Sequence, residues 1–112
     1  MTAEEQALIV KIPLQSGDFG DTEERQHIAT LEEQLIAAIK ESGSGEFDGN
    51  EFGNGVCTLY LYGGSAEQLY TVAQPILNNF QLPPGSHVIR RYGKPGSKQD
   101  RLALGEHEAS PG

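Results

Sequence analysis

The sequence predicts an α+β fold: one antiparallel sheet with two helices packed on one of its faces, in two layers. Two observations predict it. Apolar residues alternate at 8–12 and again at 56–62, which is the period of a strand. Each alternation is followed by a stretch with the apolar spacing of a helix, at 21–42 and at 65–80. The chain thus runs twice through one strand–helix arrangement, and its 112 residues are enough to bury a core as a single domain.

The first strand is expected at residues 7–14, after a polar and frayed N-terminus at residues 1–6. Successive side chains of a strand point to opposite faces. One face therefore carries Leu8, Val10 and Ile12, and the other carries Ile9 and Lys11. Pro13 cannot donate a hydrogen bond, so the strand ends there or pairs on one side only.

The first helix is expected to begin after Asp21, a good N-cap residue. Glu24 stands three positions later, as in a capping box. Gly43 suits the left-handed residue that follows a helix. The apolar stripe between them consists of Ile28, Leu31, Leu35, Ala38 and Ile39.

A hairpin is expected next, with strands at 46–52 and 56–62 and a turn at Gly53-Asn54-Gly55. A bulge near Gly49 would bring Phe47 and Phe52 to compatible sides. Cys57 falls on the same side of the strand as Leu59 and Leu61. We therefore interpret this single cysteine as a small buried apolar residue.

The second helix is expected after Ser65, with Gln68 completing a capping box. Pro75 lies inside it and is tolerable only on the solvent side. A strand at 87–92, a possible short fifth strand at 102–104 and a disordered tail at 105–112 complete the prediction. The order βαββαβ over a single domain at 7–104 is the ferredoxin-like pattern, a two-layer sandwich whose second sheet face stays open.

Charge and composition narrow the classes of partner. The net charge is −8, and all five bases after residue 55 fall within residues 90–101. This acidity disfavours nucleic-acid binding, because phosphates would be repelled. The chain has no apolar run long enough to span a membrane and no signal peptide at its start, so we expect a cytoplasmic protein without a membrane partner. No motif indicates a cofactor or a metal.

The open face of the predicted sheet is the first candidate binding surface. If Leu59 and Leu61 face the helices, then Thr58, Tyr60 and Tyr62 face outward, and Ile9 and Lys11 of the first strand join them. An exposed surface that combines apolar and aromatic side chains is typical of an interaction site. We expect a protein partner or a second copy of the chain there, as in a non-catalytic regulatory, immunity-type or inhibitor module, unless the fifth strand or the tail covers the face.

Two alternatives remain open. Four bases flank a Gly/Pro turn, and its N–H groups suit a small anion; these candidate anion-binding residues are Arg90, Arg91, Lys94 and Lys98. The hairpin acids Glu46, Asp48 and Glu51 would suit an enzyme with carboxylate acid–base chemistry, although the sequence offers no matched catalytic partner and no catalytic residue is assigned.

Three segments resemble small bacterial proteins of unassigned role. They are Gly45-Glu46-Phe47-Asp48-Gly49-Asn50-Glu51, Leu59-Tyr60-Leu61-Tyr62-Gly63 and Arg91-Tyr92-Gly93. The resemblance covers most of residues 8–104. It implies a compact α+β domain and assigns no catalytic residue.

Overall fold

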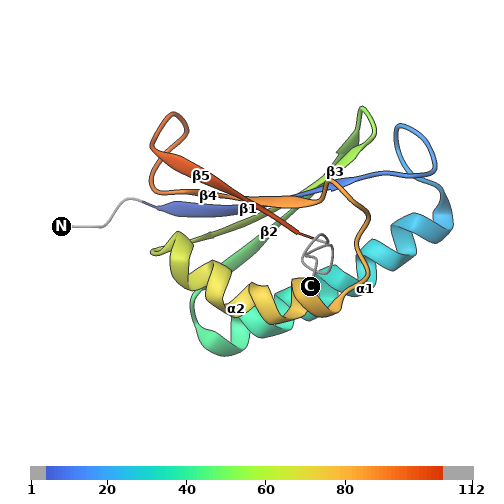
Figure 1. Ribbon diagram of the computed structural model, residues 1–112. Coiled ribbons are helices and arrows are strands. Elements are labelled where there is room, and N and C mark those ends of the chain that lie inside the picture. Colours follow the sequence, from blue (N-terminus) through green and yellow to red (C-terminus); the bar gives the residue numbers. More distant parts are fainter. Residues whose placement is uncertain (1–4, 105–112) are drawn as a thin grey trace, which may run out of the picture.

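The structure is a computed structural model that describes residues 5–104. Two helices and a five-stranded antiparallel sheet form two layers, which confirms the α+β class (Figure 1). In chain order the elements are β1 (Gln6–Pro13), α1 (Thr22–Ser42), β2 (Gly45–Gly53), β3 (Val56–Gly63), α2 (Ala66–Asn79), β4 (His87–Arg91) and β5 (Gln99–Ala103). The tail expected at 105–112 and most of the frayed start expected at 1–6 lie outside the described residues.

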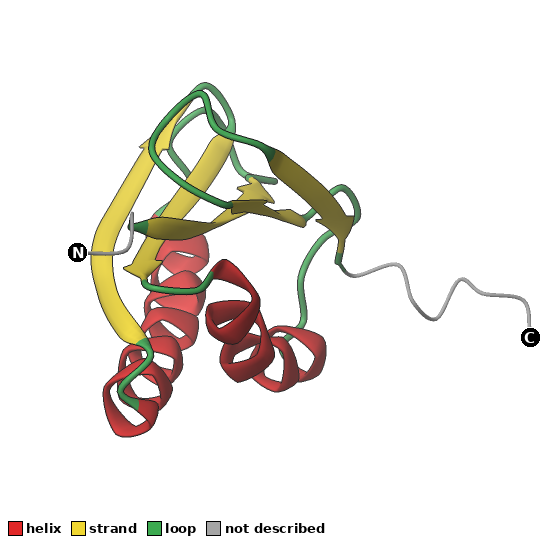
Figure 2. Cartoon of the chain, turned by 90° about the vertical axis from the view of Figure 1, so that its left-hand side faces the viewer, coloured by secondary structure: helices red, strands yellow, loops and turns green. Residues whose placement is uncertain are grey.

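The strands are ordered β2-β3-β1-β4-β5 across the sheet, and every neighbouring pair is antiparallel. β1 and β2 therefore run parallel to each other on either side of β3. The fifth strand begins at Gln99, three residues before its predicted start, because it pairs with β4 along all five residues of that strand. β5 extends the sheet at the β4 edge and does not fold over a face (Figure 2).

The core lies between the helices and one face of the sheet. Leu8 pairs with Leu61 and Val10 pairs with Leu59, so these four side chains share a face. All four are fully buried and belong to one core cluster with the helix side chains, which confirms the predicted direction of the β1 and β3 leucines. The helices contribute the other half of the core with Ile28, Leu31, Leu35 and Ile39 of α1 and Leu69, Ala73 and Leu77 of α2.

Both helix starts follow the predicted N-caps Asp21 and Ser65, but among the described residues neither Glu24 nor Gln68 makes the return bond that a capping box requires. Asp21 accepts a hydrogen bond from the N–H of Glu24 at 2.9 Å, as predicted. The Glu24 carboxylate does not close a capping box, because it accepts from the N–H groups of Gln15 (2.8 Å) and Ser16 (3.1 Å) and from the Ser16 hydroxyl. Burial acts to raise the pKa of Glu24, but the bonds from Ser16 and Gln15 outweigh it and leave this pKa lowered. Glu24 thus fixes the loop before the helix.

The hairpin follows its local sequence signals. The register shifts between Phe47 and Gly49, so the predicted bulge is confirmed. Asn54 and Gly55 form the turn with positive φ values of 55° and 77°, the backbone that a two-residue hairpin turn of this kind requires. Pro75 lies on the exposed side of the helix, where a proline was predicted to be tolerable.

Candidate functional site

The sheet face opposite the helices carries no other element of the described chain (Figure 1). We call it the open face: it consists of the β1 and β3 residues that point away from the helices and their register partners on β2, β4 and β5. In the register, Ile9 pairs with Tyr60 and Lys11 pairs with Thr58. With Tyr62, which pairs with Ala7, the structure places all five predicted partner-binding residues on this one surface.

The five residues differ in how much they present to solvent. Ile9 is 8% exposed and Thr58 is 4% exposed, so little of either side chain reaches solvent. Tyr60 and Tyr62 are half-buried, and their rings stack with centroids 6.4 Å apart and planes at 8°. The tyrosine pair, with Lys11, therefore supplies the accessible surface, while Ile9 and Thr58 support it from below.

Tyr60 is held in place by β2. Its hydroxyl donates to Glu51 Oε1 at 2.9 Å. Burial raises the pKa of Tyr60, and the bond to Glu51 and the charge of that carboxylate raise it further. The ring is thus a neutral and fixed aromatic surface, which costs little conformational entropy when something packs on it.

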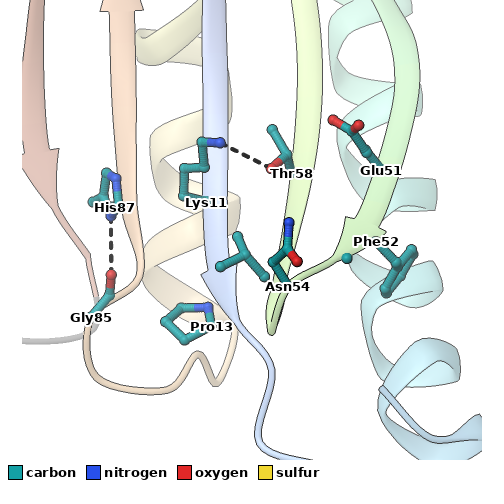
Figure 3. A pocket seen from close by; sticks show the side chains of 10 residues that line it. Lys11, Pro13, Glu51, Phe52, Asn54, Thr58, Gly85 and His87 are labelled. Atoms are coloured by element: carbon teal, nitrogen blue, oxygen red, sulfur yellow. Dashed lines mark hydrogen bonds between the residues drawn. The ribbon is translucent and has the colours of Figure 1, made fainter. Parts of the chain in front are cut away.

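A hollow of about 380 Å³ lies at one end of the open face, between the β2–β3 turn and the start of β4 (Figure 3). Lys11 points into it, and its Nζ donates to Thr58 Oγ1 at 3.2 Å. His87 lines it from β4, the strand next to that of Lys11, with Nδ1 3.0 Å from the carbonyl oxygen of Gly85. Apolar lining comes from Pro13 and Val56, so the hollow suits a group with one polar end and an apolar body.

The contribution of β4 and β5 to the open face was not part of the sequence prediction. His87, Ile89 and Arg91 of β4 pair with Lys11, Ile9 and Ala7, and Arg101 of β5 pairs with Ile89. Alternation in 87–91 is the signal that could have found the β4 residues. The alternation alone does not show whether residues 87, 89 and 91 or residues 88 and 90 face the helices, because that depends on the register of β4 with β1.

The four candidate anion-binding residues do not converge. Arg90 points to the helix side of the sheet, whereas Arg91 belongs to the open face, where its Nε donates to the carbonyl oxygen of Gly93 at 2.9 Å. Lys94 and Lys98 are exposed in the turn beyond. Successive residues of a strand point to opposite faces, so Arg90 and Arg91 cannot hold one small anion together.

Arg90 already has an anionic partner on β5. Its Nε and a terminal nitrogen donate to the two carboxylate oxygens of Asp100 at 2.9 and 2.8 Å, and its guanidinium lies 5.3 Å from the centre of the Tyr70 ring. Tyr92 donates to the same carboxylate at 2.9 Å. The bond to Asp100 raises the pKa of Arg90, and the bond from Arg90 lowers the pKa of Asp100. This pair fixes the β4–β5 hairpin.

The acids of the β2 hairpin are spread along an exposed strand. Glu46, Asp48 and Glu51 are all exposed, and Glu51 is bound to Tyr60. Among residues 5–104, no group of three or more His, Cys, Asp or Glu side chains is placed to hold a metal ion. Neither helix of this part of the chain is long and apolar enough to cross a membrane.

Cys57 is expected to be inert to thiol reagents in the folded protein. It is fully buried on the helix side of β3, as predicted, and burial, aided by the charge of Glu32, raises its pKa to about 12. A thiolate at pH 8 is therefore scarce and shielded. Ellman's reagent should label it only slowly in buffer and rapidly in concentrated urea. Rapid labelling of the folded chain would contradict this placement.

Comparisons with known proteins give no match. No protein-family model matches this chain, and no curated protein and no solved structure does so. The resemblance to small bacterial proteins therefore stays a prediction. The open face, with its stacked tyrosines and its hollow, is the feature from which a function can be proposed.

Proposed function

We propose that this chain is a non-catalytic protein-binding module whose open face is the interface. One observation carries the proposal: stacked, half-buried Tyr60 and Tyr62 lie beside Ile9 and Ile89 on a sheet face that no other described element covers. Aromatic side chains fixed over an apolar centre are the residues that dominate binding energy in protein interfaces. An uncovered sheet face of this kind marks an interaction site.

We infer that the two helices and strands β1 to β4 form the ferredoxin-like arrangement, with β5 added at the β4 edge. In this arrangement both helices lie on one face, because each helix connects two strands that run parallel with a third strand between them. The opposite face is then available to a partner along its whole width. A reducing cytoplasm suits such a module, since its one cysteine is buried and unpaired.

The proposal is tested by photo-crosslinking in cells that express the chain. Tyr62 is replaced by p-benzoylphenylalanine, which keeps the first aromatic ring and adds a photoreactive benzoyl group on the open face. The matched control carries the same group at Gln74, which is exposed on α2. We expect a protein adduct, with itself or with another chain, from position 62 and none from position 74. Absence of any adduct at position 62, or equal adducts at both positions, would overturn the proposal.

A further inference from the structure

The open face carries opposite charges at its two edges, so it can complement the same face of a second copy. Its two carboxylates, Glu46 and Glu51, lie on β2 at one edge, and both are exposed. Its two arginines, Arg91 and Arg101, lie on β4 and β5 at the other edge. A negative edge and a positive edge therefore flank the apolar and aromatic centre.

The open face is also much less acidic than the chain as a whole. The paired strand positions of the face carry two carboxylates and three permanent cations (Lys11, Arg91 and Arg101), a net charge of +1. The whole chain has a net charge of −8. Two copies of an acidic chain repel each other, whereas the charges of both signs on this face are nearly balanced.

We propose that two copies of this chain form a dimer by packing their open faces together about a two-fold axis parallel to the strands, above the gap between β1 and β3. The proposal deepens and rests on the proposed function, since it names the partner of the same surface. A two-fold contact uses the same patch on both subunits, so every pairing occurs twice. Sheets that pack in this way lie about 10 Å apart with their strands roughly aligned.

The register of the sheet gives the pairings across such an axis. In one row Glu46, Tyr62, Ala7 and Arg91 lie side by side on β2, β3, β1 and β4. Rotation about the axis keeps each row and exchanges β2 with β4 and β3 with β1. Glu46 then lies opposite Arg91 of the partner subunit, and Tyr60 of the middle row lies opposite Ile9 of the partner subunit.

The third row of residues and the comparison with an alternative axis both favour the two-fold axis parallel to the strands. Glu51, Thr58, Lys11 and His87 form a row on the same four strands, so Glu51 lies opposite His87 of the partner subunit. A two-fold axis across the strands would instead lay β2 on β2 and place carboxylates over carboxylates. Like charges in direct opposition disfavour a complex strongly, which leaves the axis along the strands.

The area of the open face sets the expected affinity of the dimer. The four strands that face their counterparts, about 4.8 Å apart and about 3.4 Å per residue along each, give a footprint of roughly 20 by 20 Å, or about 400 Å². A standard interface buries about 800 Å² on each partner, so this contact is a small one. We therefore expect a dimer that forms at high protein concentration and dissociates on dilution.

Sedimentation of two charge-reversal variants, singly and mixed, tests the dimer. Arg91→Glu places Glu46 opposite a glutamate, and Glu46→Arg places Arg91 opposite an arginine, so each variant alone should raise the dimer dissociation constant at least about tenfold. An equimolar mixture should restore association, because both contacts of the mixed dimer then join opposite charges. The control Glu33→Arg, on the exposed surface of α1, should sediment as the wild type does. Circular dichroism should confirm that all variants are folded.

The outcomes separate this inference from the proposed function. A wild type that stays monomeric at millimolar concentration, or a mixture that associates no better than the single variants, overturns the dimer. If the position 62 crosslink then joins the chain to a different protein, the binding function stands without the dimer. If position 62 yields no adduct, both fail.

Discussion

Leu35→Ala is expected to lower the free energy of unfolding by about 2–5 kcal/mol, the usual cost of truncating a fully buried leucine. Leu35 of α1 is 0% exposed and packs in the core between the helices and the sheet. Alanine removes apolar contacts and leaves a cavity that the sheet above cannot close. Small domains have only about 5–15 kcal/mol of stability, so the loss is a large share of the total. Urea denaturation followed by circular dichroism measures it.

Ile36→Ala is the matched control for Leu35→Ala. Ile36 is the next residue of the same helix, has a side chain of the same size and is 44% exposed. Its replacement should change the free energy of unfolding by about 0.5 kcal/mol or less, as surface substitutions usually do. Equal losses for the two variants would contradict the orientation of α1, and with it the assignment of the open face to the opposite side of the sheet.

Local signals in the sequence were enough to predict the element order and several ends of elements. Asp21 and Ser65 each cap a helix by accepting from the N–H three residues later, at 2.9 and 3.1 Å. Asn54-Gly55 closes the hairpin because positive φ is accessible to these two residues. Such features depend only on neighbours along the chain. The alternation of apolar residues at 56–62 likewise predicted that Leu59 and Tyr60 lie on opposite sides of β3.

Features that depend on pairing between distant strands could not be predicted in the same way. The basic segment suggested a shared anion site, but the β4–β5 register brings Asp100 beside Arg90 and gives this guanidinium an anionic partner within the chain. The hollow beside Lys11 likewise forms where the β2–β3 turn and the start of β4 meet. Neither the partner of a charge nor the shape of such a hollow is encoded in adjacent residues.

Gly63→Ala tests the close approach of the β2 and β3 backbones, which only the folded chain reveals. In the register Gly63 pairs with Gly45, where the end of β3 meets the start of β2. A Cβ on Gly63 would lie 2.2 Å from the backbone oxygen of Ser44, far inside van der Waals contact. That oxygen belongs to the backbone and cannot swing aside as the end of a long side chain can. The two strands must therefore separate locally.

We expect Gly63→Ala to lower the free energy of unfolding by about 1–3 kcal/mol, the usual cost of overpacking a close contact. Gly64→Ala is its control, because a Cβ on Gly64 has no heavy atom within 4 Å and the residue does not need positive φ. That change should be neutral or should stabilise the fold by up to about 1 kcal/mol, since alanine restricts the unfolded chain. Thermal and urea denaturation of the two variants separates these effects. Similar stabilities for both variants would mean that β2 and β3 do not approach as closely at this end. The neighbouring pair Glu46 and Tyr62 of the open face would then need a different register.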